Sequence, residues 1–533
     1  MASKKVFLIG IGGTGMRCLE AFVHTCAIGM YDNTEVHMLA LDTDKGNGNF
    51  ERLRELQNDY CLLNGDKEGG RQDTFFSARL KFYVFCPAYT GETFAKQTGY
   101  GNNTIDGAKP VSDELIDLFM DKAVLNMNLE HGYRAQTQMG SVLMYYAIQK
   151  AAYEAKRGTR HQDFKNFMQE LASGSNNPVF VFGSVFGGTG ASSIPIIAQA
   201  LDKAAETLGH NSITANNYFG TILLTNYFRF ETPNVKPGEV VAKSDNFAIN
   251  SQAALMFYNE DNTVKNFYKR MYLLGRDSAS LRNVTEGNTN VDTGGEKQKN
   301  PADFIEFMAA MAAYDFVKAC GQNDPFKQED QKFFCIAHNY ENGLLDFPLF
   351  AQDAAETLKK KMGIALAASL LSLSPESTAA QGYLYDFFVN VSQKDSRVGR
   401  MTDIDVQGTE MRALRHYFEM FGFSVDKDGN LVRGWLPQMY AARQLLFAPD
   451  LFSRATFKEL KSFKLNADLY AGDGRPSFSV PGGLLSLTST YADRTLDVVK
   501  KAFDETKKDR SSNIYDLLER TYATLMKLYF NEE

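Results

Sequence analysis

The sequence predicts an α/β fold with a mostly parallel β-sheet, followed by a helix-rich C-terminal region. An apolar run, a glycine-rich turn and a segment with helical apolar spacing occur in that order twice, near residues 6–27 and 178–208. Apolar runs without alternation are typical of strands buried on both faces of a parallel sheet. Segments after about residue 340 instead have the spacing of amphipathic helices and few strand signals.

Length and composition limit the possible classes of protein. The chain has 533 residues, more than one hydrophobic core usually organises, so we expect two domains, over residues 1–325 and 326–533. Its 57 Lys and Arg against 64 Asp and Glu form no long basic run, which argues against nucleic-acid binding. The six cysteines contain no CxxC pair, which argues against a zinc ribbon. No apolar stretch reaches the roughly 20 residues that span a bilayer, so we expect a cytoplasmic protein.

The N-terminal elements form a predicted β-α-β unit. A strand, a glycine turn, a helix and a second strand are expected at residues 6–9, 10–15, 16–27 and 36–41. The first strand is too short in its apolar part to be a signal peptide. Asp42 and Asp44 come directly after the second strand, and ligands usually bind at the carboxyl ends of parallel strands.

The middle of the chain repeats this arrangement. Residues 60–110 have weak periodicity, so we expect loops with short strands there. The elements expected after them are helices at 113–127 and 135–156, a strand at 178–183, a glycine turn at 183–190, a helix at 193–208 and a strand at 218–225. Residues 276–300 are polar and turn-rich, which predicts an exposed loop before a long helix at 301–320. C-terminal helices are expected at 350–373, 410–421, 492–508 and 512–530.

The two glycine turns are the strongest functional signal. A glycine turn between a buried strand and a helix lets backbone N–H groups approach an anion at the positive end of the helix. The first turn contains Gly12, Gly13, Thr14 and Gly15, and the second contains Phe186, Gly187, Gly188, Thr189 and Gly190. Neither is followed by Gly-Lys-Ser/Thr, so neither is a Walker A motif. The turns therefore predict a phosphate site of another kind.

The first turn alone leaves other interpretations open. Its Gly-x-Gly-x-x-Gly pattern, with Asp42 further on, also matches the fingerprint of an NAD(P)-dependent Rossmann oxidoreductase. A Rossmann oxidoreductase needs only one glycine turn, so that alternative does not explain the second turn. Glycines that merely allow close packing of helix on strand are a further alternative.

Taken together, the two turns resemble those of the tubulin/FtsZ superfamily. FtsZ and tubulin place one glycine loop after the first strand and a GGGTGTG or GGGTGSG signature after a later strand. The GxGGTG and Phe-Gly-Gly-Thr-Gly turns of this chain are most similar to those of divergent bacterial tubulin-like proteins. The resemblance covers about residues 4–320. It implies a Rossmann-like domain that binds GTP or GDP, with Mg²⁺ as a further cofactor.

Other segments resemble the nucleotide-contacting loops of that family, in the same order. The matched positions are Arg17 after the first turn, Asp42 and Asp44 in the second loop, Arg134 in the phosphate-facing third loop, Glu231 at the ribose-binding acid, and Asp303 at the guanine-pairing position, with Asn300 as a further candidate for cofactor binding. Asp303 could accept from the guanine N1–H and amino group, and Glu231 from ribose hydroxyls. A helix-start carboxylate and a solvated loop acid are the respective alternatives.

The chain departs from the FtsZ pattern at three positions. Phe186 and Ser192 replace the first and last glycines of the second signature, and Arg17 stands where FtsZ has an asparagine that touches the base. These departures bear directly on base specificity.

The resemblance also implies an activity and a partner. Members of the family assemble head to tail and hydrolyse GTP when an acid of one subunit enters the nucleotide pocket of the next. Asp346 resembles that acid but lies later than the spacing predicts, and Asp324 and Asp330 are rivals. The expected partner is therefore a second copy of this chain, in a cytoskeletal, positioning or anti-phage role. A non-hydrolysing scaffold that recruits proteins through its C-terminal region is the alternative.

Overall fold

The computed structural model describes most of the first 322 residues and shorter segments of the remainder. The described residues are 4–87, 92–101, 111–129, 133, 135–158, 160–231, 242–276, 281–283, 298, 300–322, 326, 333–336, 361, 364–365, 408–421, 423–425, 431–433, 464–465, 478–479 and 513–530.

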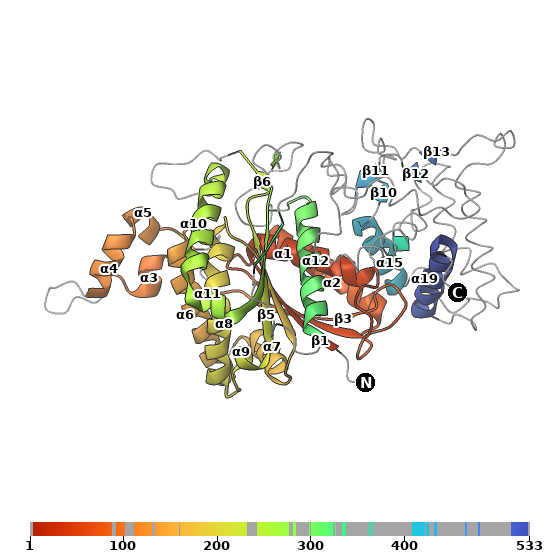
Figure 1. Cartoon of the computed structure of the whole chain (residues 1–533), viewed down its shortest axis with the longest axis horizontal. Helices are drawn as coiled ribbons and strands as arrows, with labels where there is room; N and C mark the ends of the chain where they lie inside the picture. Colours follow the sequence, from red (N-terminus) through yellow and green to blue (C-terminus); the bar gives the residue numbers. More distant parts are fainter. Residues whose placement is uncertain are drawn as a thin grey trace, which may run out of the picture.

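A seven-stranded sheet forms the centre of the molecule, and every neighbouring pair of its strands is parallel (Figure 1). The strand order is β3-β2-β1-β4-β5-β7-β9. The strands are β1 (Lys4–Ile11), β2 (Thr34–Leu41), β3 (Arg79–Phe85), β4 (Pro178–Ser184), β5 (Tyr218–Leu224), β7 (Tyr268–Leu274) and β9 (Phe333–Ile336). From β1 the chain adds β2 and β3 on one side, and it then adds β4 on the other. Ligands of such sheets bind beside this reversal, at the carboxyl ends of the strands.

Helices cover both faces of the sheet. The helices of the described N-terminal part are α1 (Gly12–Ala27), α2 (Gly48–Asn64), α3 (Phe94–Thr98), α4 (Val111–Phe119), α5 (Lys122–Leu125), α6 (Thr137–Lys156), α7 (Gln162–Ala172), α8 (Gly188–Leu208), α9 (Ile213–Asn216), α10 (Phe247–Glu260), α11 (Asn262–Phe267) and α12 (Phe304–Cys320), with a 3-10 helix at Ser244–Asn246. A two-stranded sheet pairs β6 (Phe228–Arg229) with β8 (Arg282–Asn283).

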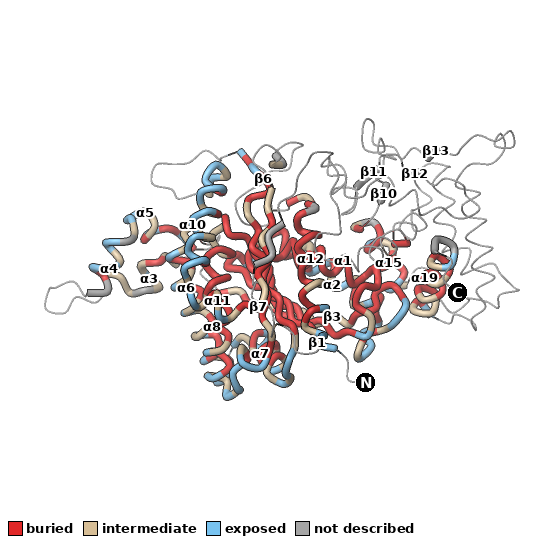
Figure 2. The backbone as a smooth tube through the Cα atoms, in the orientation of Figure 1, coloured by how far each residue is buried: buried red, intermediate tan, exposed pale blue. Residues whose placement is uncertain are grey.

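Alternate side chains of β1 enter two different cores. Val6 and Leu8 pack with side chains of α1, α2 and α12, whereas Phe7 and Ile9 pack with side chains of α6, α7 and α8. Successive residues of a strand point to opposite faces, so a strand between two helical layers needs apolar residues at every position. Figure 2 shows the central strands buried between these layers. The burial of β1 on both faces therefore explains the apolar run that predicted this strand.

The predicted fold class is confirmed, with differences in detail. Residues 60–110 hold more regular structure than expected, because α2 extends to Asn64 and β3 is a seven-residue strand paired with β2. The long helix begins at Phe304 rather than at Pro301, since Asp303 caps it. The helices expected at 135–156, 410–421 and 512–530 are found with ends shifted by two residues or fewer.

The described C-terminal helices pack on the N-terminal part. They are α15 (Thr409–Phe421) and α19 (Ile514–Phe530), and the remaining described strands form the pairs β10 (Phe423–Val425) with β11 (Leu431–Arg433) and β12 (Lys464–Leu465) with β13 (Phe478–Ser479). Leu414 of α15 and Leu518 of α19 belong to the same hydrophobic core as α1 and α2. The division at residue 325 stays a prediction, and the helix expected at 492–508 lies outside the described residues.

In the described part of the chain, no helix combines the length and the apolar character needed to cross a bilayer.

Candidate functional site

The first glycine turn joins β1 to α1 by close packing of helix on strand. Gly12 has a φ of 67°, in the left-handed region that favours glycine. A Cβ atom on Gly15 would lie 2.5 Å from the carbonyl carbon of Gly10, so no larger residue fits there without a shift. The turn thus brings the N-terminus of α1 directly to the end of β1, where its free backbone N–H groups face outward.

The second glycine turn joins β4 to α8 in the same way. Gly187 is the N-cap residue of α8, and no side chain caps this helix end. A Cβ atom on Gly190 would lie 2.5 Å from the carbonyl oxygen of Ser184, which again requires glycine for the close approach. The two turns therefore have the same structural design, although 175 residues separate Gly12 from Gly187.

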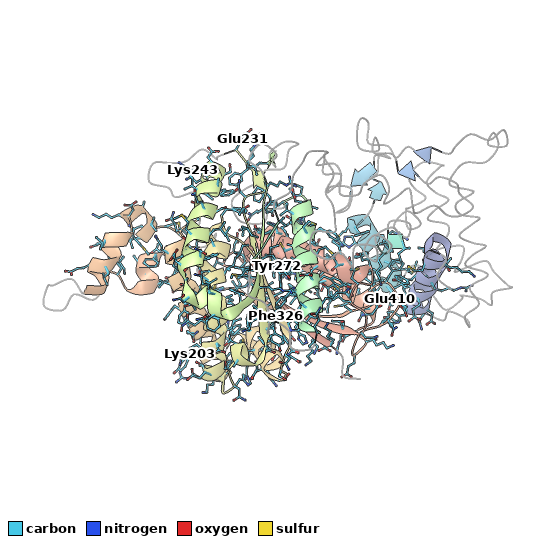
Figure 3. The ribbon with its side chains drawn as sticks, viewed as in Figure 1. Lys203, Glu231, Lys243, Tyr272, Phe326 and Glu410 are labelled. Carbon is cyan, nitrogen blue, oxygen red and sulfur yellow. The ribbon has the colours of Figure 1, made fainter. Side chains whose placement is uncertain are left out.

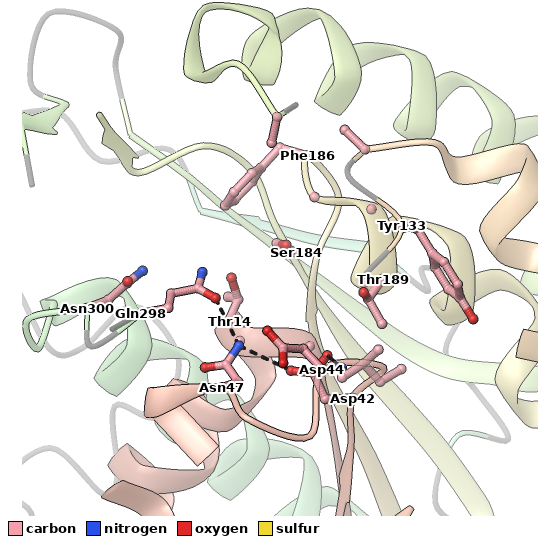
Figure 4. Close-up of a pocket in the computed structure, with 18 of the residues that line it drawn as sticks. Thr14, Asp42, Asp44, Asn47, Tyr133, Ser184, Phe186, Thr189, Gln298 and Asn300 are labelled. Carbon is pink, nitrogen blue, oxygen red and sulfur yellow. Dashed lines mark hydrogen bonds between the residues drawn. The ribbon is translucent and has the colours of Figure 1, made fainter. Parts of the chain in front are cut away.

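The two turns meet in space because β1 and β4 are neighbours. The Cβ position of Gly12 lies 3.3 Å from Cβ of Thr189 and 3.8 Å from the backbone nitrogen of Gly190. Both helix N-termini open into one pocket of about 870 Å³, a volume that includes space open to solvent. The pocket (Figure 4) is lined by Ile11, Gly12, Gly13, Thr14, Asp42, Asp44, Asn47, Tyr133, Ala135, Ser184, Phe186, Gly187, Gly188, Thr189, Gly190, Phe228, Phe230, Ala242, Phe247, Gln298 and Asn300.

Two carboxylates lie beside the glycine turns, at the end of β2. Asp42 accepts hydrogen bonds at Oδ1 from the backbone nitrogens of Thr43 (2.7 Å) and Asp44 (3.2 Å), and at Oδ2 from Asn47 (3.4 Å). Burial raises the pKa of Asp42 to about 7, and the nearby charge of Asp44 adds to this rise. The pocket therefore combines two anion-attracting helix ends with an acidic edge that favours a proton or a cation.

Four phenylalanines form an aromatic wall on the pocket. They are Phe186, Phe228, Phe230 and Phe247, none more than 8% exposed. The Phe186 ring lies 4.6 Å from that of Phe247 and 5.6 Å from that of Phe228, between centroids. Phe186, which departs from the FtsZ signature, thus connects the second turn to α10 and to β6.

Arg17 does not line the pocket. Its side chain is fully buried, and it donates to Glu20 Oε2 (2.6 Å) and to Glu306 Oε2 (2.9 Å). The hydroxyl of Tyr227 donates to the other oxygen of Glu306 at 3.0 Å. Burial raises the pKa of Glu20 to about 6, although Arg17 opposes this rise. Arg17 therefore joins α1 to α12 behind the first turn.

Asp303 caps the start of α12, which was the alternative to base pairing that its sequence context left open. Its Oδ1 accepts from the backbone nitrogen of Ile305 (3.0 Å) and from Arg276 Nη2 (2.7 Å). Glu306 in turn accepts from the backbone nitrogen of Asp303 at 3.0 Å, which completes a capping box. Asp303 is 2% exposed and, like Gly15, lies outside the pocket lining.

Glu231 is exposed and lies outside the pocket lining as well. Figure 3 shows it at the surface beyond β6, near Lys243. Arg134 and the three candidate catalytic residues Asp346, Asp324 and Asp330 fall outside the described residues, so their roles stay predictions.

Sequence reasoning missed several lining residues. Asn47 caps α2 by accepting from the backbone nitrogen of Asn49, and an Asn or Asp run after a strand is a recognisable cap signal. Gln298 comes from the loop that was expected to be exposed, and no pattern in the sequence distinguishes it. The aromatic wall includes Phe247, which lies on a helix that the sequence reading did not define.

A second group of potential metal ligands lies away from the pocket. Glu35, His37 and Glu170 place one ligand atom each within 4.8 Å of one another. Glu35 and His37 lie near the start of β2, whereas the pocket is at its end. Lys81 is 3.0 Å from Glu35 and 3.2 Å from Glu170, so a lysine already neutralises these carboxylates.

The fold and the pocket define an α/β protein with a pocket at the carboxyl edge of a parallel sheet. No family model and no curated protein matches the sequence. Among solved structures, the chain is similar to CetZ from Methanosaeta thermophila strain DSM 6194, at 13% identity and a TM-score of 0.24, over 60% of this chain and 55% of that one. It is also similar to CetZ2 from Haloferax volcanii in a GTPγS-bound protofilament, at 12% identity and a TM-score of 0.25, over 60% of each chain.

The chain thus spans 55% and 60% of the length of these two proteins. TM-scores this low do not assign it to a family.

Proposed function

We propose that the pocket binds the phosphates of a guanine nucleotide, GTP or GDP, between the two glycine turns. The observation that carries this proposal is the close approach of the two turns, since Thr189 Cβ lies 3.3 Å from where a Cβ on Gly12 would be, and the N-termini of α1 and α8 border the same space. Each helix N-terminus offers unpaired backbone N–H groups and about half a positive charge. Two such ends suit a ligand with several phosphate groups. Thr14 and Thr189 add hydroxyl donors to the same space.

A divalent cation fits the acidic edge of this pocket. Mg²⁺ prefers oxygen ligands, and it binds through one or two carboxylates together with substrate phosphates. Asp42 and Asp44 both line the pocket beside the first turn. The raised pKa of Asp42 means that a cation would stabilise its charged form. In this proposal Asp42 and Asp44 hold the cation against the phosphates.

The aromatic wall supports a nucleoside at the other end of the ligand. Phe186 and Phe228 offer flat apolar surface within the same pocket as the glycine turns. Ligand pockets that bury most of a small molecule combine such apolar surface with a few polar groups. An inorganic anion alone would leave this wall unused.

Self-assembly and hydrolysis complete the proposal. Nucleotide at a head-to-tail contact between copies of this chain would couple assembly to binding, and heterologous contacts of this kind build filaments when the rotation does not close. Asp346, with Asp324 and Asp330 as rivals, would supply the acid that positions the attacking water.

Nucleotide binding is tested by titrating the purified full chain with labelled GTP and Mg²⁺, with NADH as competitor. We expect GTP to bind, and Thr189→Ala to weaken binding roughly tenfold or more, because a hydrogen bond to a charged group is lost. Thr207→Ala, at the opposite end of α8, is the matched control and leaves the affinity unchanged. Preferential binding of NADH would refute the proposal in favour of a Rossmann oxidoreductase.

Hydrolysis is tested by phosphate release over a protein dilution series. If one subunit completes the active site of the next, the rate per subunit falls steeply as the chains separate. A concentration-independent rate would contradict catalysis between subunits. No release at any concentration, together with tight GTP binding, would favour the non-hydrolysing scaffold.

A further inference from the structure

Four carboxamide side chains gather beside Gly13; three of them line the pocket, and the fourth, Asn49, is fully buried outside that lining. This carboxamide cluster consists of Asn47, Asn49, Gln298 and Asn300. Asn47 Nδ2 donates to Gln298 Oε1 at 2.9 Å, and the backbone nitrogen of Asn300 donates to Asn49 Oδ1 at 2.9 Å. A Cβ atom on Gly13 would lie within 3.3 to 3.7 Å of amide nitrogens of Asn47, Asn49 and Gln298. The absence of a side chain at Gly13 thus leaves the cluster open to the ligand space.

The cluster has polar atoms that lack a partner. Asn300 lines the pocket and is 8% exposed, yet its Oδ1 has no hydrogen-bond partner among the described residues. Asn49 is fully buried, and its Nδ2 is likewise unpaired within the described part of the chain, but of these two residues only Asn300 lines the pocket. Leaving a buried polar group unpaired costs about 1 to 3 kcal/mol, so such atoms at a pocket point to a ligand that satisfies them.

Asp303 is held differently. Its Oδ1 already accepts two hydrogen bonds, one from the charged Arg276, and both side chains of this pair are no more than 3% exposed. Its Oδ2 has no partner among the described residues, but the residue does not line the pocket. Contact with a base would require Asp303 to share its charge with Arg276 or to move away from the helix start that it caps.

We propose that Gln298 and Asn300, rather than Asp303, contact the base of the nucleotide. This inference rests on the proposed nucleotide binding. Figure 4 shows Gln298 and Asn300 on the side of the pocket opposite Thr189 and Tyr133, so a nucleotide whose terminal phosphates lie at the second glycine turn would extend its base toward this end. A carboxamide both donates and accepts, and therefore matches the mixed hydrogen-bonding edge of a purine.

The two assignments differ in their response to xanthine. Guanine has an N1–H and an amino group, and a carboxylate can accept one hydrogen bond from each. Xanthine has a carbonyl oxygen in place of the amino group. If Asp303 reads the base, Asp303→Asn replaces an acceptor by a donor and shifts preference from GTP toward XTP. If the carboxamide cluster reads the base, that substitution leaves the preference unchanged.

The experiment measures the ratio of GTP to XTP affinity in the full chain with Mg²⁺. We expect Gln298→Ala and Asn300→Ala each to shift this ratio threefold or more, as expected for loss of one neutral hydrogen bond. Thr189→Ala weakens both nucleotides but leaves the ratio unchanged. Gln162→Ala removes an exposed carboxamide paired with Asn166 and is the matched control.

Asp303→Asn keeps a good helix cap but leaves Arg276 without its anion, so the double variant Asp303→Asn/Arg276→Gln is measured beside it. Both are expected to keep the wild-type ratio within twofold. A tenfold shift toward XTP in either variant would overturn the inference, as would unchanged ratios in Gln298→Ala and Asn300→Ala. Failure of the wild-type chain to bind any nucleotide would instead refute the proposed function.

Discussion

Arg17 on α1 and Glu306 on α12 form a buried ion pair, with Arg17 Nη2 2.9 Å from Glu306 Oε2. Arg17 also pairs with Glu20 at 2.6 Å, one helical turn further along α1. Breaking a buried pair leaves an uncompensated charge in the interior, which typically costs about 3 to 5 kcal/mol. The chain thus ties the helix behind the first glycine turn to the helix that Asp303 caps.

We therefore expect Arg17→Ala to lower the free energy of unfolding by about 3 to 5 kcal/mol in a denaturant titration. Arg54→Ala is the matched control. Arg54 and Glu51 are three residues apart and 2.6 Å from each other, as Arg17 and Glu20 are, but they lie on the exposed surface of α2. Exposed pairs are worth about 1 kcal/mol or less. Equal losses in the two variants would contradict the role given to burial.

Gly15→Ala should destabilise the fold itself. The added methyl group would lie 2.5 Å from the carbonyl carbon of Gly10, which is backbone and cannot turn aside. Overpacking of this kind costs about 1 to 3 kcal/mol or more. Gly46→Ala is the control, since the nearest atom to its new methyl group is 3.7 Å away. The melting temperature of each variant decides the matter, and an unchanged value for Gly15→Ala would refute the close packing.

Asp42 should make stability depend on pH. Its folded-state pKa is about 7, and that of an unfolded aspartate is about 3.9. Between these values the folded chain holds a proton that the unfolded chain has lost. The contribution of Asp42 to the free energy of unfolding therefore falls as pH rises from about 4 to 7, and is level above that.

The check is urea unfolding at pH 5 and pH 8 in the wild-type chain and in Asp42→Asn. The asparagine cannot ionise, so we expect a smaller loss of stability at pH 8 in the variant. Equal losses of stability in the wild-type chain and the variant would show that groups other than Asp42 cause the pH dependence. In the wild-type chain, nucleotide with Mg²⁺ should also reduce the loss, because the cation favours the ionised carboxylate.

Phe421→Ala tests how far the C-terminal helices stabilise the N-terminal part. Phe421 of α15 is fully buried, and its ring centroid lies 5.3 Å from that of His24 on α1. Truncating a buried phenylalanine costs about 3 to 5 kcal/mol. We expect a single unfolding transition shifted by that amount, whereas Arg412→Ala, on the exposed side of α15, shifts it little. A separate early transition would indicate an independent C-terminal unit.

The fold could be predicted largely because its signals are local. The run from Val6 to Ile9 and the glycines after it define a buried strand, a turn and a helix start within a few residues. β3 was harder to predict, because only Leu80, Tyr83 and Phe85 of its seven residues are buried, at irregular spacing, and its pairing with β2 fixes it as a strand. Residues such as Phe76, with a φ of 55°, depend on contacts that no short segment encodes.

The site was predictable only where one residue type has one physical role. Gly12, Thr189 and Asp42, which the sequence singles out, line the pocket, and their role in binding stays a prediction. Asp303 fits two roles equally well in sequence, and the position of Arg17 was uncertain; the partners that decide both lie far along the chain, Arg276 and Glu306. Such long-range pairing leaves no local pattern.

The pocket draws its walls from segments that extend from Ile11 to Asn300. A ligand held between them would act as a non-covalent cross-link between stretches that lie far apart in the sequence, in addition to the pairing of β1 with β4 in the sheet. After protease cuts in the intervening surface loops, the sheet and the cores would still hold the fragments together, and bound ligand would make their separation by denaturant harder. The resistance of the cut chain to separation would therefore report whether the pocket is occupied.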